Sequence, residues 1–311
     1  MADSVANAAT TAARRITLDD LELSPGKYVR LQRLLYGYGP GNGTMMLLPV
    51  DHGMEHGPVD FFDNPAALDS DYIWRLAVEG GFSGVALQYG NALKYMRPYA
   101  GRVPLVVKLN GKTNIPPDDD PLNPLNASVE DAVRVGADAV GYTLYMGSAR
   151  QDEDFAQWRQ VRQDAERFGM PTIMWAYPRG QHMEAKGGRD SFYAIDYGAR
   201  VACELGADVV KINVPKIDPD KDKLSPAPYN TMQITPDEAL AKAVQSAGKT
   251  LVLISGSSRA SDEEALEKAR LGVQAGAAGF IFGRNCFQRP WDEGLALVQR
   301  MRDMLRTAAT E

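Results

Sequence analysis

Eight short apolar runs recur along the chain, and amphipathic stretches separate them. Each run has the length of a strand and is rich in β-branched, aliphatic or aromatic residues, with polar groups, glycine or proline at its C-terminal end. The runs predict strands at 45–52, 84–90, 105–111, 139–147, 172–178, 209–215, 251–257 and 279–285. The intervening stretches repeat apolar residues at intervals of three and four. They predict helices at 69–81, 128–137, 152–169, 193–207, 235–248, 262–277 and 291–306.

Strands that alternate with helices indicate parallel pairing through right-handed crossovers, and eight such units predict a single (β/α)₈ TIM barrel of the α/β class. We expect this barrel to occupy residues 44–311. Residues 1–43 are expected to form a partly disordered N-terminal extension with a short helix around 27–37. Two long Pro/Asp-rich loops, 112–126 and 216–234, follow strands three and six and are candidate lids or subunit contacts.

Composition leaves the fold prediction unchanged but narrows the function. The chain has 311 residues, 44% hydrophobic and 24% charged, which is typical of a globular enzyme. Its net charge of −6 offers no basic footprint for nucleic acid, and no apolar stretch reaches the ~20 residues of a membrane span. The N-terminus lacks the apolar core of a secretory signal. The only cysteines, Cys203 and Cys286, favour a reducing compartment, so we expect a cytoplasmic protein without nucleic-acid or membrane partners.

Lysines on two predicted strands are the first candidates for chemistry, because the active site of this fold lies at the C-terminal rim of the strands. Lys211 lies in the apolar segment ADVVKIN. A desolvated lysine has a lowered pKa, which leaves part of it as the neutral amine that attacks a carbonyl. The alternative is a lysine that binds a phosphate or carboxylate at the rim. Lys108, in VVKLN, has the same character, and each cation is expected to lower the pKa of the other. From position alone, either lysine could form an imine.

Two aromatic residues end the strand next to that of Lys211. Neighbouring strands lie about 4.8 Å apart, so the Tyr177 hydroxyl could reach a carbon bound at Lys211. Trp175 is two positions earlier and therefore shares the same face. We expect Trp175 to fill a layer of the barrel interior and Tyr177, at the rim, to act in the function.

Asp51 ends the first strand in the segment VDHG, and the residues after it offer a metal-site alternative. Carboxylate and imidazole ligands from Asp51, His52, Glu55 and His56 would suit Zn, Mn or Fe. No further histidine lies at another rim position. We therefore expect no metal here and a hydrogen-bonding role for Asp51.

Strands seven and eight end in SGSSR and GRN, the place where many barrels hold a phosphate on backbone amides and a helix N-terminus. Gly256 and Gly283 allow close backbone approach. Further donors could come from Ser255, Ser257, Arg259 and Arg284. Because both strand ends carry the signal together, we expect a bound phosphate rather than two ordinary turns.

Taken together, these residues resemble the archaeal-type class I fructose-bisphosphate aldolases, over roughly residues 44–300. The matching segments are LLPVDHGMEHGP, VVKLNGKT, GADAVGYTLYMGS, WAYPRG, GADVVKINVP, LVLISGSSR and GFIFGRNCFQRP. The resemblance implies that Lys211 rather than Lys108 is the Schiff-base lysine, with Tyr177 as proton donor and acceptor and Asp51 assisting.

The resemblance also implies how the substrate is bound. It places one phosphate at Ser255–Gly256 and Gly283–Arg284, a second phosphate at Arg179, and Trp175 within the site. It further implies a homo-oligomer without a separate cofactor that cleaves fructose 1,6-bisphosphate reversibly, as in glycolysis and gluconeogenesis. The SGSS sequence departs from the more usual S-G-G at strand seven.

Two alternatives to this function stay open. Related Schiff-base enzymes, of aldolase, thiolase or transaldolase type, keep the lysine and act on other phosphorylated compounds, so Lys211 does not by itself fix the substrate. A non-catalytic barrel that binds phosphosugars would keep the phosphate loops while the lysine pair would be incidental.

Overall fold

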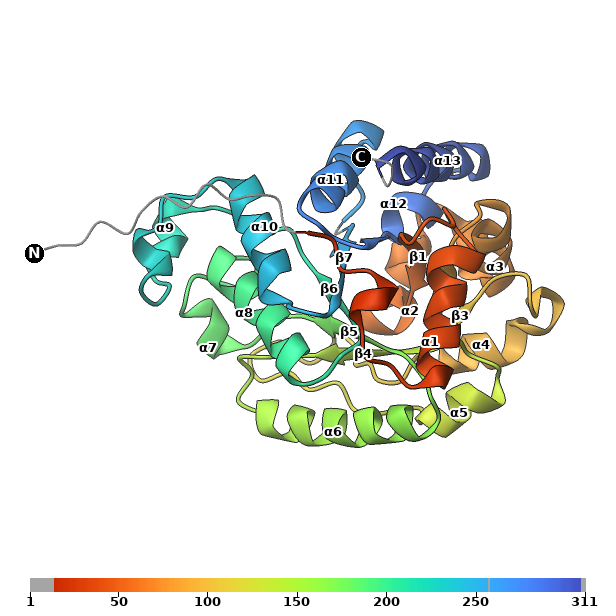
Figure 1. Ribbon diagram of the computed structural model, residues 1–311, viewed down its shortest axis with the longest axis horizontal. Helices are drawn as coiled ribbons and strands as arrows, with labels where there is room; N and C mark the ends of the chain where they lie inside the picture. The colour runs from red at the N-terminus through yellow and green to blue at the C-terminus, as the bar shows by residue number, and fades with distance from the viewer. Residues whose placement is uncertain (1–13, 257, 309–311) are drawn as a thin grey trace, which may run out of the picture.

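Eight parallel strands close into a barrel in the computed structural model, which describes residues 14–256 and 258–308 (Figure 1). Each strand pairs with its sequence neighbours, and Met45↔Gly279 pairing between β1 and β8 closes the ring. The strands are β1 Met45–Val50, β2 Gly84–Gln88, β3 Leu105–Lys108, β4 Ala139–Leu144, β5 Thr172–Ala176, β6 Val209–Ile212, β7 Leu251–Ser255 and β8 Gly279–Ile281. The predicted (β/α)₈ barrel is therefore confirmed.

Every predicted strand is present, and every one ends before its predicted end. The run predicted at 209–215, for example, forms β6 Val209–Ile212, and Asn213 already belongs to the following loop. The polar, glycine and proline residues that close each run leave the sheet, because they build the rim rather than continue the ladder.

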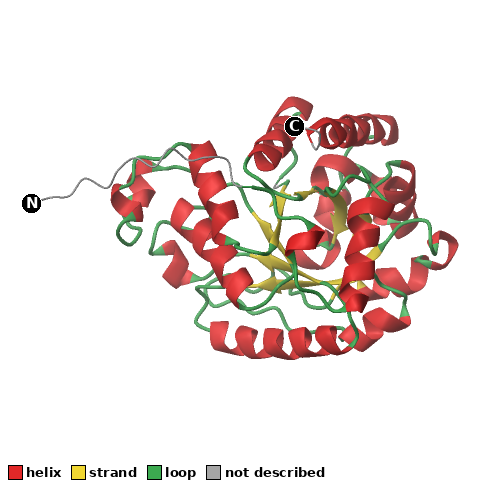
Figure 2. Ribbon diagram, viewed as in Figure 1, coloured by secondary structure: helices red, strands yellow, loops and turns green. Residues whose placement is uncertain are grey.

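Helices surround the strands, which lie at the centre of the molecule (Figure 2). All seven predicted helices are present, with shifted ends: α3 Ser70–Glu79, α5 Val129–Arg134, α6 Gln151–Arg167, α8 Phe192–Glu204, α10 Pro236–Ser246, α11 Asp262–Gln274 and α13 Trp291–Ala308. Shorter helices occupy connections that the periodicity did not mark: α2 His52–Glu55, α4 Tyr89–Tyr95, α7 Gln181–Glu184, α9 Pro219–Asp222 and α12 Arg284–Phe287. In the described part of the chain, no helix has the length and apolarity needed to cross a membrane.

The described part of the N-terminal segment covers the end of the barrel opposite the rim. The short helix predicted around 27–37 forms α1 Pro25–Gln32 and a π-helical turn, Arg33–Gly37. Leu31 and Leu34 are fully buried in the same apolar cluster as the inward-facing Met45. Lys27 Nζ lies 3.1 Å from Asp208 Oδ2, just before β6.

This packing joins the extension to the barrel core. Residues 1–13 lie outside the described residues, so the expectation of partial disorder there stays a prediction, as does the domain boundary at residue 44.

Candidate active site

A cavity of about 540 Å³ opens at the C-terminal ends of the strands. Most of the predicted site residues line it: Asp51, Tyr177, Arg179, Lys211, Ser255, Gly256, Gly283 and Arg284. Lys108 and Trp175 are buried in the barrel, 0% and 1% exposed. Ser257 lies outside the described residues. The rim thus brings together residues from strands one, five, six, seven and eight, with Lys108 on strand three.

Lys108 is held by two carboxylates. Its Nζ lies 2.9 Å from Asp51 Oδ2 and 2.9 Å from Glu55 Oε1. Burial opposes the charge, yet these two anions outweigh it and raise the pKa of Lys108. The pKa of Lys108 is therefore raised because its nearest charges are negative, and the expected effect of the second lysine on it stays a prediction.

Asp51 shares that ion pair and stays ionised. It is 4% exposed, and burial alone would raise its pKa. The charges of Lys108, His52 and Lys211 instead hold the pKa of this carboxyl well below its usual range. For His52, burial is the main cause that lowers the pKa to about 4, so its ring is neutral near pH 7. The site therefore offers a permanent carboxylate beside a neutral imidazole.

The geometry disfavours the metal-site alternative. His56 Nδ1 lies 2.7 Å from Asp60 Oδ2, while Asp51 and Glu55 are both occupied by Lys108. Within 14–256 and 258–308, no three His, Cys, Asp or Glu side chains come together as a metal-binding group. Three of the four side chains that this alternative requires therefore have other partners: Asp51 and Glu55 share Lys108, and His56 pairs with Asp60.

Lys211 has a different environment from Lys108. The register pairs it with Trp175, and its Nζ lies 5.2 Å from the ring centroids of both Trp175 and Tyr177. Lys211 is 6% exposed. Among the described residues, no carboxylate lies within ion-pair distance of its ammonium, although both carboxylates around Lys108 have that contact. Of the two barrel lysines, Lys211 is the one that lines the cavity.

Trp175 fills the barrel interior, as expected, and also contacts both lysines. Lys108 Nζ lies 4.8 Å from the centroid of its ring, within the range of a cation–π interaction. Gly141 on β4 makes the room, since a Cβ there would lie 2.7 Å from Trp175 Cζ3 and 3.1 Å from Lys108 Cδ. The indole therefore fixes the spacing between the two cations.

Tyr177 and Arg179 follow β5 and lie at the cavity wall. The half-buried Tyr177 packs against the barrel interior, and its backbone N–H donates to the Leu144 carbonyl at 3.0 Å. Arg179 Cζ lies 5.2 Å from the centroid of the Tyr177 ring. The pairing of Trp175 with Lys211 in adjacent strands thus places Tyr177 next to the lysine, as the strand order predicts.

The ends of β7 and β8 form another wall of the cavity. The buried Nε of Arg284 has no hydrogen-bond partner among the described residues. An unsatisfied buried donor is costly, so an anion at this position would relieve it. A Cβ on Gly283 would lie 2.4 Å from the Pro49 carbonyl oxygen, and one on Gly256 would lie 2.8 Å from Phe282 Cδ1. Packing between strands therefore already requires both glycines.

Arg259 does not line this wall, although its position in the sequence suggested it as a hydrogen-bond donor to the phosphate. Its Nη1 donates to the Gln288 carbonyl at 3.2 Å and lies 3.4 Å from Asp63 Oδ2. Its guanidinium is thus bound away from the cavity, outside the set of lining residues.

Further polar residues that the motifs did not single out also line the cavity: Lys112, Arg189, Asp190, Asn213, Lys216 and Lys268. Asp190 accepts hydrogen bonds from Asn213 at 3.0 Å and from Lys216 at 2.9 Å. Burial opposes ionisation of Asp190, but these partners lower its pKa. Asn213 directly follows β6, so its position at the C-terminal end of a strand could have identified it from the sequence. The others lie in loops and a helix, where no strand end marks them.

Comparison with known proteins finds aldolases by family model and by sequence. The model of the DeoC/LacD family aldolases matches residues 45–289. A "fructose-bisphosphate aldolase class 1" from Thermoproteus tenax is 42% identical over 248 residues, covering 79% of this chain and 84% of the relative. A "fructose-bisphosphate aldolase/6-deoxy-5-ketofructose 1-phosphate synthase" from Methanocaldococcus jannaschii is 32% identical, covering 82% of this chain and 79% of the relative.

A solved structure gives the same answer in three dimensions. It is an archaeal fructose-1,6-bisphosphate aldolase whose catalytic lysine is covalently bound to the carbinolamine intermediate of its substrate. The match has a TM-score of 0.75 at 36% identity and covers 89% of this chain and 99% of the archaeal one.

Proposed function

This chain belongs to the DeoC/LacD family of aldolases, and on that premise we propose that it is a class I fructose-bisphosphate aldolase. It cleaves fructose 1,6-bisphosphate reversibly to dihydroxyacetone phosphate and glyceraldehyde 3-phosphate, through an imine on a lysine of the protein.

The observation that carries the proposal is the contrast between the two lysines. Lys108 is fixed by Asp51 and Glu55 at 2.9 Å each and is held protonated, which removes it as a nucleophile. Lys211 lines the cavity beside two aromatic rings and has no such pair among the described residues. We therefore assign the imine to Lys211.

The reaction follows from that assignment. The neutral amine of Lys211 adds to the C2 ketone, and the carbinolamine loses water to give a protonated imine. The C3–C4 bonding electrons then move toward the imine nitrogen, which releases the aldehyde product and leaves an enamine. Protonation at C3 and hydrolysis of the imine release dihydroxyacetone phosphate and return the lysine.

Tyr177 and Asp51 supply the proton transfers. In its deprotonated form, the Tyr177 oxygen takes the proton from the C4 hydroxyl as the C3–C4 bond breaks and then gives that proton to C3, since its ring lies beside Lys211. Asp51, held ionised next to Lys108, accepts and returns protons while the carbinolamine forms and loses water. Lys108 serves the catalysis through this pair.

Two ends of the cavity receive the two phosphates. We assign the phosphate on the imine side to Ser255, Gly256, Gly283 and Arg284, which line the cavity, and the other phosphate to Arg179. Ser257 is assigned to the imine-side phosphate from the sequence alone. The unpartnered Nε of Arg284 supports the first assignment. No cofactor or metal takes part in this scheme, because the imine itself serves as the electron sink. We further propose that the protein is a homo-oligomer, is cytoplasmic and acts in glycolysis and gluconeogenesis.

A second substrate is favoured by one observation. The relative from Methanocaldococcus jannaschii carries a synthase activity for 6-deoxy-5-ketofructose 1-phosphate in its name. The same lysine and imine-side phosphate site would serve such a phosphorylated ketose.

A panel of phosphorylated ketoses, assayed with the purified protein, tests both proposals. We expect the highest kcat/KM for fructose 1,6-bisphosphate. Turnover of another ketose alone would replace the first substrate with the second. Binding of phosphosugars without any turnover would instead support the non-catalytic barrel.

A further inference from the structure

The loop between β7 and α11 lines the cavity on one side and is held from the other side by a fully buried amide. Ser255, Gly256 and Ser258 line the cavity, whereas Asn285, which is 1% exposed, does not. Asn285 lies in α12, directly after Arg284. Its side chain contacts the backbone of the lining residues Gly256 and Ser258 without lining the cavity itself.

Three hydrogen bonds join the Asn285 side chain to the backbone of this loop. Nδ2 donates to the Gly256 carbonyl at 3.0 Å and to the Ser258 carbonyl at 3.3 Å. Oδ1 accepts from the Ala260 N–H at 2.9 Å. An amide has both donors and an acceptor, so it satisfies three backbone groups that no single carboxylate or hydroxyl could satisfy together.

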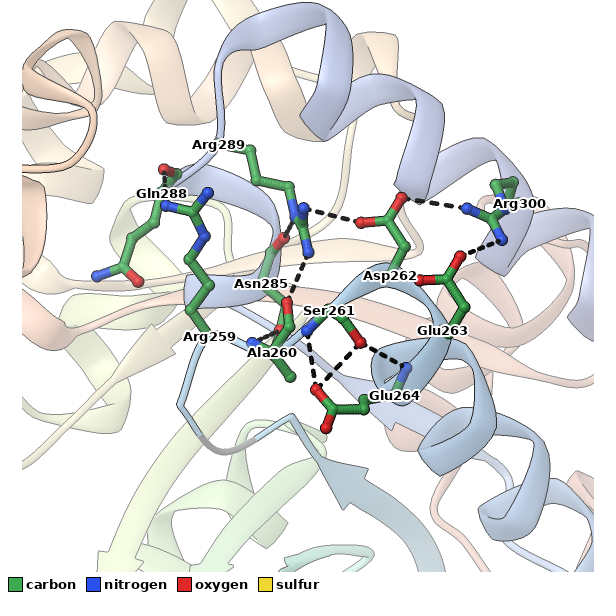
Figure 3. Close-up of polar contacts among 10 residues, drawn as sticks. All are labelled: Arg259, Ala260, Ser261, Asp262, Glu263, Glu264, Asn285, Gln288, Arg289 and Arg300. Carbon is green, nitrogen blue, oxygen red and sulfur yellow. Dashed lines mark hydrogen bonds and ion pairs between the residues drawn. The ribbon is translucent and has the colours of Figure 1, made fainter.

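Arg289 joins Asn285 to Ala260 in the same loop and to Asp262 (Figure 3). Its Nε donates to the backbone carbonyl of Asn285 at 2.7 Å, and its Nη2 donates to the backbone carbonyl of Ala260 at 2.8 Å. Its Nη1 lies 2.8 Å from Asp262 Oδ1, at the start of α11. Arg289 is only 8% exposed, so these contacts are shielded from water.

We infer that Asn285 and Arg289 are positioning residues for phosphate binding: they hold the β7–α11 loop in the shape that accepts the imine-side phosphate. This inference rests on the proposed function and extends it to residues that touch no substrate. Their loss should weaken phosphate binding far more than the chemistry at Lys211, because Lys211 is positioned independently by β6 and the rings of Trp175 and Tyr177.

The variant Asn285→Asp tests this with little change in volume. The carboxylate cannot donate to the Gly256 and Ser258 carbonyls and places a buried negative charge against them. Competitive inhibition by inorganic phosphate reports phosphate binding without imine formation, and of the two proposed phosphate sites only the imine-side one contacts this loop. Borohydride trapping of Lys211 with dihydroxyacetone, which carries no phosphate, reports the imine chemistry alone.

We expect the inhibition constant of inorganic phosphate to rise about 10- to 100-fold, the loss associated with a broken buried hydrogen-bond set. Trapping with dihydroxyacetone should fall by less than about threefold. Arg289→Lys keeps the positive charge but loses the several N–H donors of the guanidinium, so the inhibition constant of inorganic phosphate should rise less than in Asn285→Asp. This variant tests the inference if Asn285→Asp does not fold. Arg300→Gln is the matched control, because Arg300 pairs with Asp262 and Glu263 in the same network and has no hydrogen bond or ion pair to the described loop residues 256 and 258–260.

Unchanged phosphate inhibition in both variants would overturn the inference. So would an equal loss of phosphate binding and of dihydroxyacetone trapping in a folded variant, since that pattern indicates general damage to the site. Failure of the proposed function is distinguishable, because it appears in the wild-type protein as the absence of any imine at Lys211.

Discussion

The Lys108 ammonium lies 2.9 Å from the Asp51 carboxylate, inside the barrel and shielded from water. The contact keeps Asp51 ionised at pH values where an isolated carboxyl in the same place would be protonated. Under the proposed function, Lys108 would therefore act through this partner rather than on the substrate.

Replacing Lys108 by methionine should alter the pH dependence of catalysis. The pKa of Asp51 is lowered in the wild type, so Asp51 is ionised down to low pH. Without Lys108, burial dominates and the pKa rises, so the acid limb of kcat/KM should move to higher pH by about one unit or more. Imine formation at Lys211 should be slower but still trappable.

The matched control is Glu55→Gln, which removes the other carboxylate and leaves the pair of Asp51 and Lys108. Its acid limb should move far less than that of Lys108→Met. An unchanged acid limb in folded Lys108→Met would contradict the role given to this ion pair.

Replacing Tyr177 by phenylalanine removes the hydroxyl and keeps the ring that lies 5.2 Å from Lys211 Nζ. Folding should hardly change, and substrate should still form the imine. Cleavage should slow by roughly 10²- to 10⁴-fold, the usual effect of losing one positioned acid–base group. Borohydride should then trap at least as much adduct as in the wild type, because intermediates accumulate before the blocked step.

Tyr145→Phe is the control for this experiment, since Tyr145 lines the same cavity and burial raises its pKa. It should retain most of the cleavage activity. Near-normal turnover by Tyr177→Phe together with a large loss in Tyr145→Phe would transfer the proton shuttle to Tyr145.

The N-terminal helix should contribute to stability without affecting catalysis. Lys27 is buried and pairs with Asp208, which precedes β6. Lys27→Met leaves that buried carboxylate without its cation, which should lower the free energy of unfolding by about 3 kcal/mol in urea denaturation. Lys223→Met, at an exposed pair with Asp220, should cost less than about 1 kcal/mol. Equal effects of the two variants would contradict the structural role of α1.

Removal of divalent metals should leave the enzyme active. Asp51 and Glu55 bind Lys108, so they are not available as metal ligands. After dialysis against EDTA, kcat and KM for fructose 1,6-bisphosphate should stay within about twofold of the untreated values. Loss of activity that returns when Zn²⁺ or Mn²⁺ is added would instead favour the metal-dependent alternative.

The sequence predicted the features that depend on local pattern. Apolar runs located every strand, and the order of the strands placed Tyr177 beside Lys211. Strand ends were overestimated, because the polar, glycine and proline residues that close each run belong to the rim, where the backbone has already left the sheet.

The side-chain partners were harder to predict, because they depend on contacts across the barrel. Glu55 lies one helical turn after Asp51, a spacing that places both carboxylates toward the same side of α2, but only the fold brings Lys108 between them. Arg259 was a possible phosphate donor from its position alone, whereas Asp63 and Gln288 hold it elsewhere.

Borohydride reduction in the presence of fructose 1,6-bisphosphate, followed by peptide mass spectrometry, tests the central claim most directly. The assignment predicts a reduced adduct on Lys211 in the wild type and in Lys108→Met, and no adduct in Lys211→Met. An adduct on Lys108 that survives in Lys211→Met, or the absence of any adduct in the wild type, would contradict it.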